Sequence, residues 1–194
     1  MATRLVHADS RLPRLLDEAA RLFRSQGFGG SSMRDIARAV EMSPGSLYCH
    51  FATKEELLAA VYLKGVDAIS AEVEAAVAGR SDPWERLERA CIAHLEAILR
   101  DNDYAQVVVR VRPSDAPVVC ERLIALRNRY EALFVALIAA LPLPTGSDRH
   151  ALRLLLIGAL NGAQTWYRPD GRLGPRAIAR RFVGLIRSGQ EALA

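Results

Sequence analysis

The sequence predicts an all-α fold in two parts, a three-helix head followed by a larger helical body. Across the 194 residues, apolar side chains recur at the spacings of three and four that mark one face of a helix, and no segment shows the alternation of a half-buried strand. Glycine and proline interrupt this pattern at residues 79–83, 113–117, 142–147 and 169–175, which divides the body into separate helices. A hydrophobic fraction of 51% supplies enough apolar side chains for a large core.

The first helix is expected over residues 10–26. Leu15, Ala19 and Leu22 fall on one of its faces, and Gly27 follows as an end signal. This apolar face is expected to pack on the two short helices that come next.

Each of those short helices opens with a serine, and a tight turn separates them. Ser32 and Asp35 have the spacing of an N-terminal cap. Ser43 offers its side-chain oxygen to free amides, and Pro44 occupies a first-turn position that needs no N–H. The pattern predicts a helix-turn-helix. The outward face of its second helix is small or polar and has no carboxylate to repel phosphate, as expected in the major groove of DNA: Gly45, Ser46, Tyr48, Cys49 and His50.

Charge adds little to this prediction. The net charge is +4, and residues 1–64 hold nine Lys or Arg against seven acids. Specific DNA binding needs local phosphate contacts rather than a high global charge, so the prediction depends on the motif.

A long helix is expected over residues 54–78, where it would connect the head to the body. Leu57, Val61 and Ile69 are among the apolar residues at helical spacing along it. We place the domain boundary at its start, with a DNA-binding domain over 1–53 and a ligand-binding and dimerisation domain over 54–194. The remaining helices are expected over residues 82–100, 104–111, 116–141, 148–167 and 175–192.

Such a body can enclose a ligand cavity. Polar groups on otherwise apolar helices fix the orientation of a bound molecule, although each can also be an ordinary core or solvated side chain. Guanidinium, amide and indole N–H groups are the donors that a polar ligand head requires. The candidate effector-binding residues are His94, Arg110, Arg127, Tyr130, Phe134, Gln164 and Trp166.

Small residues at spacings of four mark the expected helix over residues 148–167. Gly158 and Gly162 would let another helix approach closely, either within one subunit or across a two-fold interface. Two helices from each subunit would then form a four-helix bundle. The candidate interface residues are Leu155, Gly158, Gly162, Ile178, Phe182 and Leu185.

The first sixty residues resemble the N-terminal domain of TetR-family transcriptional repressors. The resemblance rests on Ala19-Ala20-x-Leu22-Phe23 with Gly27-Phe28, on residues 31–51, and on Lys54 with Leu57-Leu58. It implies that Tyr48, His50 and Lys54 hold phosphates, that Ser43, Gly45 and Ser46 face bases or backbone, and that the protein dimerises through its last two helices. The chain departs from the family pattern at Pro44, where a basic or polar residue is common. The DNA-binding candidates are Arg34, Ser43, Pro44, Gly45, Ser46, Tyr48, His50 and Lys54.

Residues 161–171, NGAQTWYRPDG, resemble a segment of TetR regulators of fatty-acid and steroid-ring catabolism. Several of those regulators are released from DNA by acyl-CoA thioesters. The alternative is structural, with Trp166 and Tyr167 closing a helix end before Pro169 and Gly171 turn the chain.

No catalytic, metal or cofactor site is expected. Cys49, Cys91 and Cys120 share no short spacing with histidine that would suggest zinc, and no Glu-x-x-His pair suggests a di-iron bundle. Cys120 also lacks an evident base partner, so the chain is not expected to be an enzyme.

The first residues do not form a signal peptide, because Arg4 and Asp9 interrupt any apolar run, and no stretch approaches the roughly 18 apolar residues of a membrane span. A cytoplasmic protein with no membrane partner is expected.

The expected function is that of a homodimeric, ligand-responsive repressor. It would bind a palindromic double-stranded DNA operator and be released by a small amphipathic effector such as an acyl-CoA. The alternative is a helix-turn-helix assembly factor without an effector, whose operator affinity would stay constant across metabolites.

Overall fold

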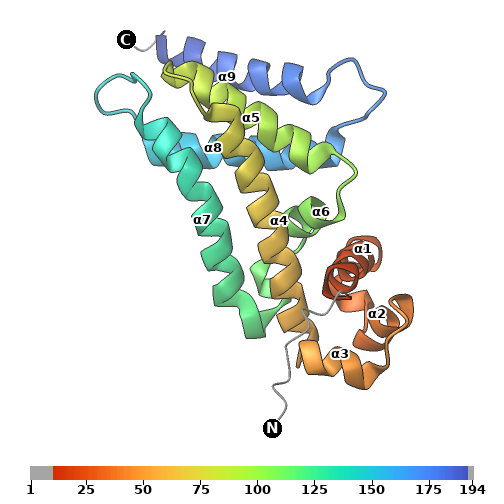
Figure 1. Ribbon diagram of the computed structural model, residues 1–194. Coiled ribbons are helices and arrows are strands. Elements are labelled where there is room, and N and C mark those ends of the chain that lie inside the picture. The colour runs from red at the N-terminus through yellow and green to blue at the C-terminus, as the bar shows by residue number, and fades with distance from the viewer. Residues whose placement is uncertain (1–10, 192–194) are drawn as a thin grey trace.

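The computed structural model describes residues 11–191. In that range the chain forms nine α-helices and two short 3-10 helices and contains no strand, so the all-α prediction is confirmed (Figure 1). Positions 10 and 192, the expected ends of the first and last helices, lie outside the described residues. The α-helices are α1 Leu12–Gly30, α2 Met33–Ala39, α3 Pro44–His50, α4 Lys54–Val77, α5 Pro83–Leu99, α6 Asp103–Arg110, α7 Cys120–Ala139, α8 Arg149–Trp166 and α9 Pro175–Glu191.

The head consists of α1, α2 and α3, and its short helices begin where the serines predicted. The Ser32 side chain accepts a hydrogen bond from the backbone N–H of Asp35, and the Ser43 side chain accepts one from that of Ser46. Gly27 has a φ of 75° and breaks the helical geometry of α1, which makes it the end signal that the sequence indicated.

Helix α4 runs from the head to the far end of the body (Figure 1). Its start is capped by Thr53, whose side chain accepts from the N–H of Glu56. In the body α4 packs against α5, α6 and α7, while α9 lies on α5. Helices α5, α8 and α9 gather at the end of the body remote from the head (Figure 1).

The expected start of the seventh helix at residue 116 is wrong. Two 3-10 turns, Pro113–Asp115 and Pro117–Val119, precede α7, which begins at Cys120. A residue before proline is disfavoured in the α conformation, and Ala116 indeed has φ −134° and ψ 73°. Apolar side chains at helical spacing therefore continue across this segment, although its backbone is not α-helical.

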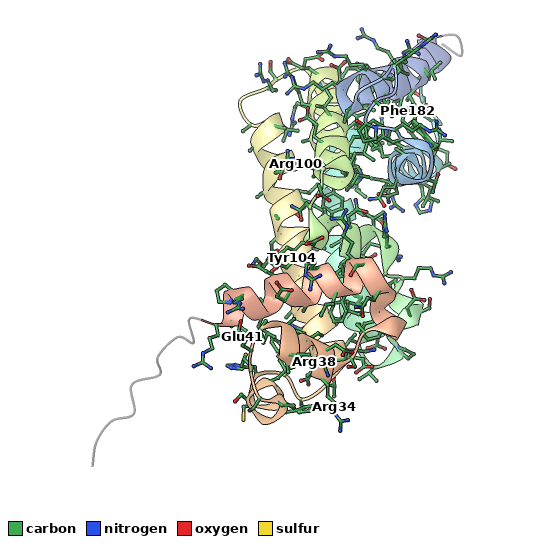
Figure 2. All side chains as sticks on the ribbon, turned by 90° about the vertical axis from the view of Figure 1, so that its right-hand side faces the viewer. Arg34, Arg38, Glu41, Arg100, Tyr104 and Phe182 are labelled. Carbon is green, nitrogen blue, oxygen red and sulfur yellow. The ribbon has the colours of Figure 1, made fainter. Side chains whose placement is uncertain are left out.

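Helix α6 lies between the head and the rest of the body. It approaches α4 so closely at Gly65 that an added Cβ would lie 2.7 Å from Cγ2 of Val108 and 2.8 Å from the backbone oxygen of Tyr104. Its first turn is bonded to α1, since the Tyr104 hydroxyl donates to Asp17 at 2.6 Å. Figure 2 shows Tyr104 at the level where head and body meet.

Candidate DNA interface and effector pocket

Helix α3 packs on the rest of the head through one fully buried side chain, that of Leu47. Every other residue of this helix is exposed, including Tyr48 at 51%. A short helix held in this way presents nearly its whole surface to a partner. The predicted DNA-contacting residues of α3 are all on that surface: Pro44, Gly45, Ser46, Tyr48 and His50, with the capping Ser43 just before them.

A hollow of about 460 Å³ lies where the start of α2, the end of α3 and the start of α4 meet. Arg34 and Lys54 place two positive charges on it, and Tyr48 adds a hydroxyl. Charged donors and a hydroxyl around one open hollow are suited to a phosphate oxygen. Arg34 lies at the end of the head remote from the body (Figure 2).

Lys54 is more constrained than the sequence suggested. Its Nζ donates to the backbone oxygens of Phe28 at 2.7 Å and Ser31 at 2.9 Å, and lies 4.3 Å from the centre of the Phe28 ring. An ammonium has three N–H donors, so two are committed to the connection between α1 and α2. Lys54 therefore holds the head together as well, and one donor remains for the predicted phosphate contact.

This structural role of Lys54 changes the expected effects of substitutions. We expect Arg34→Ala to lower the salt dependence of operator binding by about one unit of slope without changing the melting temperature. Lys54→Met should lower the melting temperature as well, because two partly buried backbone carbonyls lose their donor. Fluorescence anisotropy across a salt series, with thermal melts of both variants, measures the two effects. Equal melting temperatures for Lys54→Met and the unmodified protein would contradict the structural role.

A partly open pocket of about 190 Å³ lies in the body, bounded by α4, α5, α6, α7 and α8. Of the seven predicted effector residues, His94, Arg127 and Tyr130 line it. Phe134 lies behind them, fully buried, with its ring 5.9 Å from that of His94 and 5.7 Å from that of Tyr130. The full lining is Tyr62, Ile69, His94, Ile98, Val108, Val109, Val111, Arg112, Pro113, Arg127, Tyr130, Glu131, Ile157 and Asn161.

Three polar side chains form a chain of hydrogen bonds in this pocket. Nε2 of His94 lies 3.1 Å from Oδ1 of Asn161, and Nδ1 of His94 lies 2.5 Å from the Tyr130 hydroxyl. The amide oxygen only accepts, so Nε2 carries the proton and Nδ1 accepts from the hydroxyl. Burial lowers the pKa of His94 to about 4, against a smaller opposite effect of the Asn161 hydrogen bond, so the ring is neutral near pH 7.

This burial should appear in the pH dependence of stability. In the unfolded chain His94 takes up a proton near pH 6.5, whereas in the folded chain it stays neutral down to about pH 4. The unfolded state thus binds more protons between those values, and stability falls as the pH falls through them. From pH 7 to pH 5 we expect His94 to account for a loss of about 2 kcal/mol.

Denaturant unfolding of the native protein and of His94→Gln at both pH values isolates this contribution. The variant should lose less stability on acidification, and the same loss in both proteins would contradict the burial of a neutral ring. His150→Gln is a matched control on an exposed histidine.

Three of the predicted effector residues are corrected, because they do not reach the pocket. Arg110 is exposed at the end of α6. Gln164 donates from Nε2 to the backbone oxygen of Ile98 at 3.1 Å, and Trp166 is 52% exposed with its ring 6.4 Å from that of Phe182. Asn161 lines the pocket but was not among the predicted effector residues, although asparagine inside a helix is unfavourable and therefore indicates a special role.

The candidate interface residues divide into two groups. Ile178 is only 2% exposed and belongs to the core of its own subunit, so its assignment to the interface is corrected. Leu155 and Leu185 are 64% and 73% exposed, and Phe182 is half-buried. A Cβ added at Gly158 or Gly162 would meet nothing within 4 Å, so neither glycine is required by packing inside the described chain.

Two family models match the chain. Residues 15–61 match the model of bacterial regulatory proteins of the tetR family, and residues 80–190 match the tetracyclin repressor-like C-terminal domain. The chain belongs to the TetR family. It is therefore a helix-turn-helix transcriptional regulator, and α3 lies within the matched N-terminal region.

Full-length TetR relatives are similar to this chain. The HTH-type transcriptional repressor KstR2 of Mycobacterium tuberculosis is 28% identical over 188 residues, which are 93% of each chain. A solved structure of AibR in complex with isovaleryl coenzyme A and operator DNA has a TM-score of 0.78 and 26% identity, covering 90% of this chain and 97% of AibR. The TetR regulator PfmR from Thermus thermophilus has a TM-score of 0.73 and 30% identity, with 89% and 96% coverage.

These comparisons confirm two further predictions. The resemblance to regulators of lipid or steroid catabolism is confirmed, since the KstR2 structure is that of a ketosteroid transcriptional regulator, at 25% identity and a TM-score of 0.70 over 93% of this chain and 95% of KstR2. The relatives are transcriptional regulators rather than enzymes. Within residues 11–191 no helix is long and apolar enough to cross a membrane, and no His, Cys, Asp and Glu cluster could hold a metal ion.

Proposed function

We propose that this TetR regulator is a homodimeric repressor of a palindromic operator, released when a small CoA thioester enters the pocket in the body. One observation carries the proposal: α6 lines the pocket with Val108 and Val109 and is bonded to the head through Tyr104. The same short helix therefore contacts both the effector pocket and the head. Repression by KstR2 and the isovaleryl coenzyme A in AibR support the two functional elements.

The coupling runs through three helices. Tyr104 and Lys64 both bond to Asp17, and the Lys64 Nζ to Tyr104 Oη distance is 2.8 Å, so α6, α4 and α1 share one polar cluster. Arg24 on α1 adds a bond to Asp103 at 2.8 Å. A ligand that favours another position of α6 disturbs these bonds and shifts the population of head positions. DNA and effector then oppose each other reciprocally, because each prefers a different arrangement.

The charged side of the pocket suits a coenzyme A head group. The Arg112 side chain is 80% exposed and that of Arg127 is 48% exposed, so both guanidinium groups reach solvent from the pocket wall. Arginine binds phosphate oxygens in a bidentate manner. Each guanidinium has a carboxylate neighbour, Asp115 at 3.5 Å from Arg112 and Glu131 at 3.6 Å from Arg127, with which a phosphate would compete. The acyl group would then occupy the apolar interior.

Operator release tests the proposal. A labelled operator is titrated with the protein, and isovaleryl-CoA and related thioesters are added while anisotropy is followed. We expect saturable release for at least one thioester, and loss of that release in Val109→Phe, which fills the pocket. Val118→Phe is the control, because Val118 is 76% exposed and away from the pocket. Operator affinity that no thioester changes, with an unchanged melting temperature, would instead favour the assembly factor.

A further inference from the structure

We propose that the effector carries a carbonyl oxygen on the part of its acyl group that lies deepest in the pocket, where the side-chain amide of Asn161 donates to it. The inference rests on the proposed function and specifies the ligand of the same pocket. It distinguishes short oxo-acyl thioesters from saturated acyl thioesters.

The pocket has two chemically different ends. Arg112 and Arg127 lie at the solvent side, as their exposed side chains show. His94 is 2% exposed and Tyr130 is 8% exposed, so the end of the pocket that they line is the buried one. Asn161, which bonds to His94 there, is partly exposed. A fatty-acyl pocket would be apolar at its closed end. This pocket is instead apolar along its walls and polar at its closed end.

At this end of the pocket, the side-chain amide of Asn161 has hydrogen-bond donors without a partner among the described residues. Tyr130 donates its hydroxyl proton to His94, and His94 donates its Nε2 proton to Oδ1 of Asn161. The Asn161 Nδ2 group has two N–H donors that make no hydrogen bond with the described residues. Asn161 lines the pocket, so these donors are available to a bound molecule. A ligand ending in a methyl group would cover these donors without accepting a hydrogen bond from them, which weakens its binding.

The acceptor has to be neutral. His94 is uncharged near pH 7, so no positive charge at this end would stabilise a carboxylate. A keto or ester carbonyl accepts a hydrogen bond without carrying charge, and it therefore fits this end.

The volume limits the size of the acyl group. About 190 Å³ is below the roughly 300–1,000 Å³ of drug-sized ligand pockets, so a short or compact acyl group fits and a long chain does not. The ligand class is thus a CoA thioester with a short acyl group that carries a neutral oxygen away from the thioester.

Matched thioesters test this inference. Pentanoyl-CoA and 4-oxopentanoyl-CoA differ at one carbon, and calorimetry gives their affinities for the native dimer. We expect the oxo compound to bind at least about tenfold more tightly. In Asn161→Leu, which has a similar volume and no donor, the preference should disappear or reverse. Asn128→Leu makes the same change at an exposed position of α7 and should keep the preference. If Asn161→Leu does not fold, Asn161→Ala removes the same donors.

The outcomes separate the two proposals. Equal or tighter binding of pentanoyl-CoA by the native protein overturns the carbonyl inference while the thioester-responsive function survives. Persistence of the oxo preference in Asn161→Leu also overturns it, because the donor would lie elsewhere. Binding of neither compound, together with no operator release by any thioester, overturns the proposed effector class and this inference with it.

Discussion

Replacing Gly158 by leucine should convert the protein to a monomer and weaken operator binding by about a hundredfold or more. The expectation follows from the apolar surface of α8 and α9, where Leu155 and Leu185 are largely exposed. A leucine at residue 158 would meet nothing within its own subunit, so the monomer should fold normally, but it would keep a partner helix at a distance. Two linked heads bind more tightly than one by a factor of about 10²–10⁴, which the monomer loses.

Sedimentation and operator anisotropy measure this effect. Gly158→Ala adds only a methyl group and should stay largely dimeric. Ala71→Leu introduces the same side chain on an exposed position of α4 and should leave both the mass and the affinity unchanged. A Gly158→Leu protein that sediments as a dimer would place the interface elsewhere.

Gly65→Ala should destabilise the fold by about 1–3 kcal/mol, although alanine is the better helix former. The new Cβ would lie 2.8 Å from the backbone oxygen of Tyr104, and backbone cannot move aside as a flexible side chain can. Helix α6 must shift away from α4, so effector release of DNA should change together with stability.

The same substitution at Gly184 is the matched control. Gly184 lies in α9 with no atom within 4 Å of an added Cβ, so alanine there should stabilise by up to about 1 kcal/mol through helix propensity. Opposite signs at the two glycines, measured by denaturant unfolding, are the expected result. A stabilising effect at both positions would show that α4 and α6 separate at little cost.

The head was predicted well because its signals are local. Ser32 and Ser43 each act within three residues, and a cap of that kind can be identified without knowing the tertiary structure. The structural role of Lys54 was not predicted because its carbonyl partners, Phe28 and Ser31, are more than twenty residues away in the sequence. A lysine next to a helix-turn-helix has the same sequence pattern whether it contacts a phosphate or a carbonyl.

In the body, the burial of individual side chains could not be predicted from the sequence. Helical spacing gave the order of the helices, but Ile178 and Leu185 both belong to apolar stretches of α9, and only packing on α5 decides which one is buried. The direction of Arg110 likewise depends on how α6 turns against α4. His94 and Tyr130 were found because a polar group on an apolar helix is unusual, and Asn161 could have been found by the same criterion.

The two ends of helix α6 contact different parts of the molecule, the head and the pocket. Asp103 and Tyr104 in its first turn bond to the head, while Val108 and Val109 in its last turn line the pocket. The pocket side can therefore be rebuilt in a directed-evolution library while the first turn is kept constant. Under the proposed function, such a library would yield reporters with altered chemical specificity and an unchanged output, so α6 is the helix at which to begin engineering a biosensor from the chain.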